Sequence, residues 1–203
     1  MYLGKEMILT QMGESSTETL LHMKRKTYVC HHGQGLDIND LLHLTGVIMR
    51  SDVISLDEMY MAIAVAASRR SRDPVLQVGA CVVDNYGRVK AVGYNNMPND
   101  DNDKYPWCKD DPDPLHNKGL YVCHAEQRAI ASCAGDLRGC SIYVTLHPCN
   151  VCAKLIVLSG MKSVTYLDDR HGIRYQASRK ILTKSGVELK KYHTTGRTLV
   201  CKL

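Results

Sequence analysis

The sequence predicts an α/β fold in which a mixed sheet is covered by helices on both faces. Two features of the chain lead to this prediction. The β-rich runs "QVGACVVDN" and "RVKAVGYNN" are joined at "NYG" and are typical of a hairpin. Beyond them, strand-like and helix-like segments alternate, and this order after an opening hairpin implies a mixed sheet between helices.

A helix precedes the hairpin. Ser55 and Glu58 of "SLDE" match a capping box, in which each side chain binds the other residue's backbone N–H at the start of a helix. The helix should end near "SRRSRDP". Apolar residues at helical spacing predict its buried face: Met59, Ala62, Ile63, Ala66 and Ala67.

The second half of the chain follows a long polar loop, residues 97–119, which we expect to be irregular. The expected elements after the loop are a helix from 124 to about 134, the strand "SIYVTL", a helix from 149 to about 159, the strand "SVTYLDD", a helix near 175–184 and the strand "VELKKYH". These segments complete the mixed sheet and its helical layers.

Length and composition indicate one ordinary domain, since the chain has 203 residues, a mass of 22.7 kDa and 44% hydrophobic residues. We expect an N-terminal extension over 1–54, poorly structured or partly helical, a folded domain over 55–193 and a basic C-terminal tail over 194–203. The extension contains Cys30, His31 and His32, but no complementary pair of ligands lies at a suitable spacing. We therefore expect no second metal site there.

The sequence also indicates where in the cell the protein is located. No apolar run approaches the ~18–20 residues that a membrane helix needs, and the first residues lack the charged-then-apolar pattern of a secretory signal. The nine cysteines are odd in number and two form C-x-x-C, which in an intracellular protein indicates metal or redox chemistry more often than disulfides. We expect a cytoplasmic protein with reduced thiols and no membrane association.

Two short stretches carry the chemistry. In "YVCHAEQ", His124 and Glu126 open a predicted helix, and in "LHPCNVCAK", Cys149 and Cys152 open another. Both helix starts are expected at one edge of the sheet, where ligand sites of open α/β sheets form. Cysteines three apart in a first helical turn point the same way, and the helix start favours the thiolates that zinc binds. His124, Cys149 and Cys152 would hold one zinc ion and leave a fourth position for water, as in a catalytic site.

Glu126 lies two residues from a predicted ligand and need not bind the metal. It can instead take a proton from the water and pass it to a substrate nitrogen. H-x-E followed by P-C-x-x-C is the signature of zinc nucleobase deaminases, so the two stretches predict hydrolytic removal of an amino group from a base.

The stretches "RSRDPVLQVGACVV", "GYNNMPN", "YVCHAE" and "YVTLHPCNVCAKLIVLSGMKSV" resemble the deoxycytidylate (dCMP) deaminase family, and the resemblance runs through most of residues 55–193. It implies a three-layer, cytidine-deaminase-like α/β fold with a five-stranded mixed sheet between helices. It also implies hydrolysis of dCMP to dUMP and ammonia, which feeds thymidylate synthesis. Members of the family assemble as hexamers, so the resemblance implies a homo-oligomer.

The resemblance keeps the zinc ligands and the proton shuttle in the roles given above and adds substrate contacts. Asn95 corresponds to the asparagine that holds the sugar, and its alternative is a turn residue after the second strand. Apart from the resemblance, the backbone groups around Ala80 and Cys81 lie on the predicted strand beside the site and would contact the base, the alternative being an ordinary buried strand.

The segment "GYNNMPNDD" departs from the family pattern "GYNGMPxGC", which the resemblance links to an allosteric site for dCTP and dTTP. Asn96, Asp100 and Asp101 leave this regulation open, because added carboxylates repel a triphosphate unless a cation such as Mg²⁺ intervenes. His147 stands where phenylalanine is common, and it either packs in its place or contacts the metal site or a phosphate.

A nucleotide enzyme must neutralise about two phosphate charges, and arginines suit this task. Arg70, Arg72 and Arg128 are candidates, although each can equally be a surface charge.

Besides a dCMP deaminase, three functions stay open. A dCTP deaminase would use the same zinc scaffold. An editor of single-stranded nucleic acid would need a basic groove, which the acidic residues of 100–114 disfavour. An inactive regulatory subunit would not need Glu126.

Overall fold

The computed structural model describes residues 52–200. The predicted N-terminal extension, with Cys30, His31 and His32, lies outside the described residues apart from its last three positions. Helices and strands run from Leu56 to Lys191, and residues 194–200 of the predicted tail contain neither.

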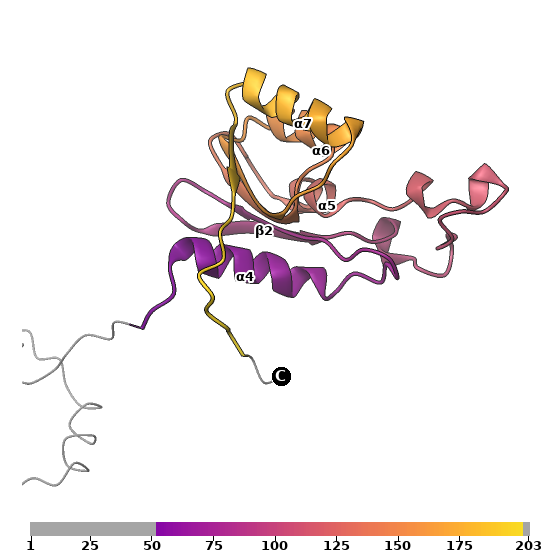
Figure 1. Cartoon of the computed structure of the whole chain (residues 1–203), viewed down its shortest axis with the longest axis horizontal. Helices are drawn as coiled ribbons and strands as arrows, with labels where there is room; N and C mark the ends of the chain where they lie inside the picture. Colours follow the sequence, from indigo (N-terminus) through magenta and orange to yellow (C-terminus); the bar gives the residue numbers. More distant parts are fainter. Residues whose placement is uncertain (1–51, 201–203) are drawn as a thin grey trace, which may run out of the picture. The chain divides into compact units, whose positions relative to one another are not determined.

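The sheet has five strands in the order β2-β1-β3-β4-β5 (Figure 1). Their bounds are Gly79–Val83 (β1), Val89–Tyr94 (β2), Ser141–Leu146 (β3), Ser163–Asp168 (β4) and Glu188–Lys191 (β5). β1 is antiparallel to β2 and to β3, whereas β3, β4 and β5 are parallel. The predicted hairpin and the predicted mixed sheet are confirmed.

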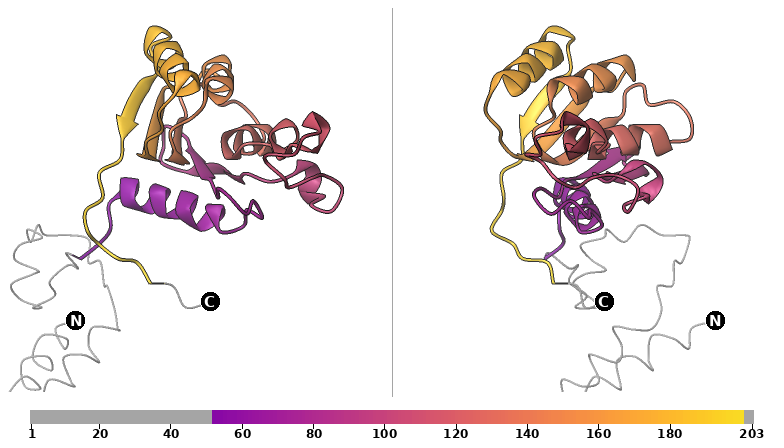
Figure 2. Two further views of the ribbon diagram at one scale, coloured as in Figure 1. Left: turned by 45° about the vertical axis from the view of Figure 1, so that its right-hand side comes forward. Right: turned by 90° about the vertical axis from the view of Figure 1, so that its right-hand side faces the viewer.

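Helices cover both faces of the sheet, as Figures 1 and 2 show. On one face lies α4, Leu56–Ser68, whose buried Tyr60 packs with Cys81 of β1 and Tyr143 of β3. The other face is covered by α5 (Ala125–Ser132), α6 (Asn150–Leu158) and α7 (Ile173–Lys184). Successive strand residues point to opposite faces, so the sheet separates two cores and the three-layer prediction is confirmed.

The start of α4 agrees with the prediction from its sequence, and its buried face agrees in part. Ser55 and Glu58 form the predicted capping box, with both reciprocal hydrogen bonds present. The buried positions are Tyr60, Met61, Ala64, Ala67 and Ser68. Of the predicted face, Ala67 is buried, Met59 and Ile63 are partly buried against the same core, and Ala66 is exposed. The predicted face does not include Tyr60, whose hydroxyl donates to the Gly87 carbonyl while its ring packs on the sheet. The other elements differ from their predicted bounds by at most two residues at either end.

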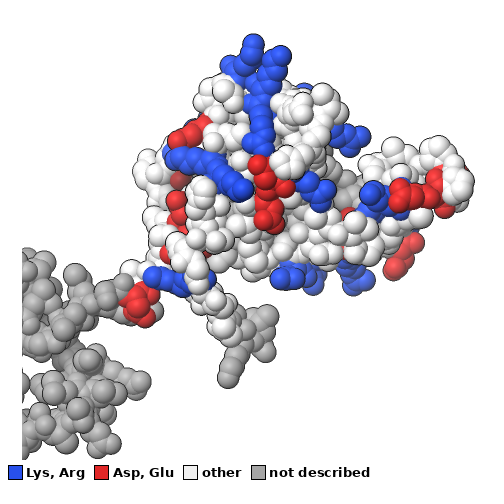
Figure 3. Space-filling model, in the orientation of Figure 1, with Lys and Arg blue, Asp and Glu red and all other residues white. Residues whose placement is uncertain are grey.

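The loop over 97–119 contains three short 3₁₀ turns and no α-helix or strand. The turns are Pro98–Asp100, Pro114–His116 and Lys118–Leu120. Figure 3 shows acidic and basic side chains next to one another on this loop, at the right of the view, and lysines and arginines over α7 at the top. None of the described helices is long and apolar enough to cross a membrane.

Two glycines let helices lie close against the sheet. A Cβ atom on Gly79 would lie 1.9 Å from the Ala64 carbonyl oxygen of α4, and one on Gly93 would lie 2.2 Å from the Ala125 carbonyl oxygen of α5. Both are backbone contacts that a side chain would disrupt. Because α5 follows His124 directly, Gly93 sets how deeply the start of this helix sits against the sheet.

Candidate active site

His124 and Cys149 stand at the starts of two helices. His124 is the N-cap of α5, and its backbone N–H donates to Oε1 of Gln127 at 2.8 Å. The residue before it, Cys123, pairs with Asn96 in an isolated bridge that ties this helix start to the end of β2. Cys149 is the N-cap of α6, shortly beyond the end of β3.

The fold brings His124, Cys149 and Cys152 together. Nδ1 of His124 lies 3.5 Å from Sγ of Cys149 and 3.3 Å from Sγ of Cys152, and the ligand atoms of all three residues lie within 4.8 Å of one another. With Zn–N and Zn–S bonds of about 2.0 and 2.3 Å, two corners of a tetrahedral site are roughly 3.5 Å apart. The donor set and its spacing therefore fit a zinc ion with one coordination position left over.

The surroundings of the two buried sulfurs favour a cation. Hydrogen bonds from the Cys152 thiol and from His124 lower the pKa of Cys149, which favours the thiolate form of this sulfur. The neighbouring Cys149 and burial raise the pKa of Cys152. A divalent cation would remove this second proton as well, because it would be the largest local charge.

Glu126 lies beside this cluster in the first turn of α5, and only 4% of it is exposed. Its carboxyl is a hydrogen-bond partner of the Cys152 thiol, but it is not among the three converging ligands. Burial raises the pKa of Glu126, and the nearby His124 opposes the rise. A carboxyl whose pKa is raised by burial holds a proton more readily than a free carboxyl, and beside the metal donors it is suited to proton transfer.

Asn95 directly follows β2 and is buried, and its amide is engaged by the chain. Its Oδ1 accepts from the Val78 N–H at 2.7 Å, and its Nδ2 donates to the Leu76 carbonyl at 2.9 Å. An amide oxygen has two lone pairs, so Oδ1 can still accept from a sugar hydroxyl. The sugar contact of Asn95 stays a prediction.

Ala80 is fully buried in β1, where it pairs with Gly93 of β2 and Val144 of β3. Its side chain belongs to the core beneath α5, with Ala125 and Ala129. The contact between Ala80 and the base also stays a prediction.

Arg128, a predicted phosphate candidate, is engaged within the chain. Its guanidinium donates to the Met97 carbonyl at 3.0 Å and to Oδ1 of Asp100 at 2.8 Å. The Asp100 carboxylate also accepts from the Tyr94 hydroxyl and from the Asn96 amide. We call Tyr94, Asn96, Asp100 and Arg128 the Asp100 network. The carboxylate that departs from the family pattern is thus neutralised by the chain itself.

Of the other candidate cations, Arg70 lies over the Tyr94 ring at 5.9 Å from its centre, and Arg72 is exposed. Sequence reasoning missed Arg174, an exposed residue at the start of α7. A hydrogen bond with Cys149 raises the pKa of His124, and the charge of Arg174 opposes this rise, so Arg174 lies within electrostatic reach of the cluster. Only the folded chain brings the starts of α5 and α7 near one another, and no local pattern signals it.

His147 packs in the core, with 1% of its surface exposed. Its ring meets the Tyr166 ring edge-on at 4.7 Å, and its Nδ1 lies 2.9 Å from the Pro148 carbonyl oxygen. Burial lowers the pKa of His147, so the ring is neutral at pH 7. The packing interpretation of His147 fits this position.

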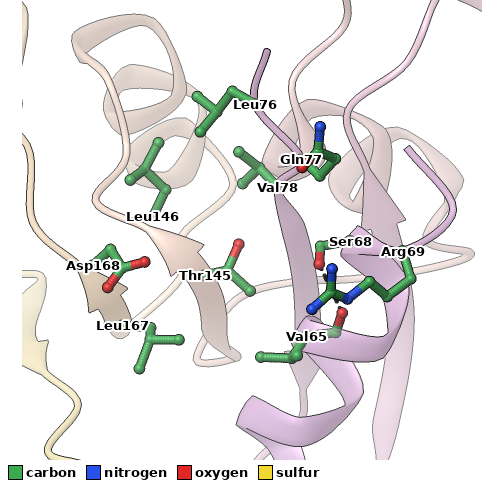
Figure 4. A pocket seen from close by; sticks show the side chains of 10 residues that line it. All are labelled: Val65, Ser68, Arg69, Leu76, Gln77, Val78, Thr145, Leu146, Leu167 and Asp168. Carbon is green, nitrogen blue, oxygen red and sulfur yellow. Dashed lines mark hydrogen bonds between the residues drawn. The ribbon is translucent and has the colours of Figure 1, made fainter. Parts of the chain in front are cut away.

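A cavity of about 190 Å³ lies between α4 and the ends of β3 and β4 (Figure 4). Its lining residues are Val65, Ser68, Arg69, Leu76, Gln77, Val78, Thr145, Leu146, Leu167 and Asp168. None of the three metal-ligand candidates is among them, so the cavity is separate from the cluster. One of its walls is the segment 76–78, which Asn95 binds.

Comparisons with known proteins agree with this geometry. The family model described as "Cytidine and deoxycytidylate deaminase zinc-binding region" matches residues 54–168. The chain belongs to this deaminase family. The matched range contains His124, Glu126, Cys149 and Cys152, and the resemblance identified from the sequence motifs is confirmed.

Two curated relatives of this deaminase are named for the same nucleotide. The probable deoxycytidylate deaminase of Drosophila melanogaster is 42% identical over 159 residues, which cover 74% of this chain and 78% of the relative. The deoxycytidylate deaminase of Homo sapiens is 40% identical over 147 residues, which cover 70% of this chain and 83% of the relative.

A solved structure supports the fold of the deaminase. The dCMP deaminase from the cyanophage S-TIM5, in complex with dCMP and dUMP, has 30% sequence identity and a TM-score of 0.56. The match covers 71% of this chain and 100% of that chain. The predicted cytidine-deaminase-like fold is therefore confirmed.

Proposed function

We propose that this chain is a zinc-dependent enzyme that hydrolyses dCMP to dUMP and ammonia. The observation that carries the proposal is the convergence of His124, Cys149 and Cys152 with the buried Glu126 beside them. The family match and the relatives named deoxycytidylate deaminase support dCMP as the substrate.

The three ligand residues would hold one zinc ion. A zinc ion in such a site supplies positive charge and makes water acidic enough to act as a nucleophile at neutral pH. Glu126 and the ligands lie at the starts of two helices anchored on the sheet, so their relative positions are set before substrate arrives.

Glu126 would move the protons. In the reaction a C–O bond forms at C4 of cytosine and the C4–N bond breaks, so that water and dCMP give dUMP and ammonia. Glu126 accepts a proton from water and gives it to N3. It then takes the proton of the new hydroxyl on C4, which becomes the carbonyl of dUMP, and delivers this proton to the departing amine, which leaves as ammonia. Burial raises the pKa of Glu126, which favours its holding a proton between these transfers.

Asn95 would hold the sugar through the free lone pair of Oδ1, and the backbone near Ala80 would contact the base. For the phosphate, Arg128 is the weakest candidate because Asp100 already pairs with it. Arg70, Arg72 and Arg174 remain candidates, and Arg174 is favoured by its electrostatic reach to His124.

Regulation and assembly are further parts of the proposal. The internal pairing of Asp100 weighs against a Mg²⁺-bound triphosphate effector at the segment 96–101. We propose a homo-oligomer, which light scattering on the purified protein tests. We propose a reducing, cytoplasmic setting, because the odd number of cysteines and the C-x-x-C of Cys149 and Cys152 favour metal binding over disulfides.

The test is direct incubation of the purified protein with cytidine, dCMP, dCTP and a cytosine-containing oligonucleotide, followed by chromatography of the uracil products. We expect dUMP from dCMP and little product from the other three. Release of dUTP from dCTP at a comparable rate would favour the dCTP deaminase instead. No product from any substrate, with zinc bound, would favour the inactive regulatory subunit.

A further inference from the structure

A buried ion pair lies next to Asn95, outside the metal cluster. Asp73 belongs to the connection between α4 and β1, and Lys118 belongs to the last 3₁₀ turn of the loop over 97–119. Nζ of Lys118 donates to Oδ1 of Asp73. Both residues are buried, with 5% of Asp73 and 8% of Lys118 exposed.

The Asp73 carboxylate also orders its own segment. Its Oδ1 accepts from the backbone N–H of Val75 at 2.8 Å and of Leu76 at 3.1 Å. Its Oδ2 lies 3.4 Å from Nδ2 of Asn95. One carboxylate thus joins three parts of the chain: the segment before β1, the residue after β2 and the loop that leads to His124.

Asn95 continues the sheet through its side chain. Its backbone N–H donates to the Val78 carbonyl at 3.1 Å, and its Oδ1 accepts from the Val78 N–H at 2.7 Å. The amide can do this only with Oδ1 toward Val78 and Nδ2 toward acceptors. The Leu76 carbonyl and the Asp73 carboxylate are those acceptors, so they fix which way the amide faces.

Packing alone does not hold the segment 76–78. Val78 belongs to the hydrophobic core and Leu76 packs against it, but with Gln77 they also line the cavity of Figure 4, so only part of their surface contacts close-packed side chains. The polar contacts to Asn95 and Asp73 therefore carry more of the positioning than they would in a filled core.

A buried ion pair contributes little net stability, because the desolvation of both charges offsets their attraction. Its effect is instead a defined arrangement of the groups around it, here the orientation of one amide. We infer that Asp73 and Lys118 are positioning residues, which hold the Asn95 amide in the orientation that receives the sugar of the nucleotide. The inference rests on the proposed function for its substrate, but the contacts can be tested without substrate.

The first test is hydrogen exchange at the Val78 amide, which reports directly on its bond to Asn95. We expect exchange in Asp73→Asn and in Lys118→Met to accelerate by about tenfold or more, the usual consequence of losing one hydrogen bond to a charged group. Lys104→Met, which removes an exposed lysine from the same loop, is the matched control and should leave Val78 unchanged. Unchanged exchange at Val78 in both Asp73→Asn and Lys118→Met would overturn the inference.

The second test is steady-state kinetics with dCMP. We expect the KM of both variants to rise by about tenfold, with kcat within about threefold of wild type and zinc content unchanged, since ground-state contacts to the sugar are affected and the cluster is not. Equal loss of activity and zinc in both variants would indicate general disruption and overturn the positioning role.

The double variant Asp73→Asn/Lys118→Met separates positioning from charge balance. It leaves no unpaired buried charge, so thermal stability should recover relative to the single variants. An asparagine at 73 that uses its oxygen for the Val75 and Leu76 N–H groups presents its NH₂ group toward Nδ2 of Asn95. KM should therefore stay high, whereas recovery of both stability and KM would contradict the inference. If the wild-type protein converts no dCMP, the proposed function fails, and exchange at Val78 still decides whether the pair holds Asn95.

Discussion

The metal cluster and the Asp100 network are both groups of polar side chains near the ends of strands, but they differ in whether the chain supplies the partners of those side chains. In the metal cluster, an imidazole and two thiols converge and have chiefly one another as partners. In the Asp100 network, both carboxylate oxygens of Asp100 already have donors, from Tyr94, Asn96 and Arg128. The first arrangement calls for a cation, whereas the carboxylate of the second is satisfied by the chain, and only Oδ1 of Asn96 in this network is buried without a partner.

The two clusters are also connected. Asn96 donates from its side chain to Asp100, and its backbone bridges to Cys123, the residue before His124. The Asp100 network therefore helps to hold the start of α5, where the metal cluster is built. Deaminase activity should therefore depend on the metal cluster far more strongly than on the Asp100 network.

Removing the thiols should have the largest effect. Cys149→Ser/Cys152→Ser removes both sulfur ligands and leaves the His124 imidazole alone, so bound zinc and deaminase activity should both disappear. Metal analysis after gel filtration measures this, with Cys108→Ser/Cys133→Ser as the matched pair of cysteines outside the cluster. Stoichiometric zinc in the Cys149→Ser/Cys152→Ser protein would refute the ligand assignment.

Glu126→Gln should come next. Glutamine keeps the shape and the hydrogen-bonding reach but cannot carry the proton, so turnover should fall by at least about 10²–10⁴ while zinc and fold survive. Kinetics and metal analysis on the same preparation check both points. Loss of the metal would make Glu126 a ligand or a structural support, and near-normal turnover would mean that it is not the shuttle.

Gly93→Ala probes the packing that places His124. Its Cβ would meet the backbone of α5, including the Ala129 nitrogen at 2.6 Å, so helix and sheet must separate. We expect a loss of about 1–3 kcal/mol in the free energy of unfolding, measured with urea. Gly119→Ala is the control, because its Cβ meets only the Asn117 side chain, and an equal loss there would remove the special role of Gly93.

Asp100→Asn should have the smallest effect, seen in stability and not in zinc content. Burial alone would raise the pKa of Asp100. Hydrogen bonds from Asn96 and Tyr94 and the charge of Arg128 nevertheless hold this pKa below its ordinary value. A lowered carboxylate pKa stabilises the fold above the unfolded value of about 4, and this contribution is lost as pH falls through the folded pKa.

The stability difference between wild type and Asp100→Asn should therefore be present at pH 7 and shrink below about pH 4. Unfolding curves across this range measure it, and Asp101→Asn, whose exposed carboxylate pairs with Lys104, serves as the control. A difference that does not change with pH would show that the carboxylate charge is not what stabilises the network.

Local patterns predicted much of the fold. The capping box at Ser55, the hairpin turn near Gly87 and the alternation after it depend on neighbouring residues, so the sequence signals them directly. The buried face of α4 was harder to predict from the sequence. Tyr60 has an apolar ring and a polar hydroxyl, and its burial depends on the sheet against which it packs.

The sequence by itself determined which residues have the chemistry for zinc and proton transfer, because His124, Glu126, Cys149 and Cys152 lie in short motifs with fixed spacing. Only the tertiary structure decided how the charges between those motifs are used. Arg128 pairs with Asp100, Lys118 with Asp73, and Arg174 comes near His124, although these partners lie far apart along the chain. Charge partners depend on distances in space, and such distances arise only when the sheet and helices have assembled.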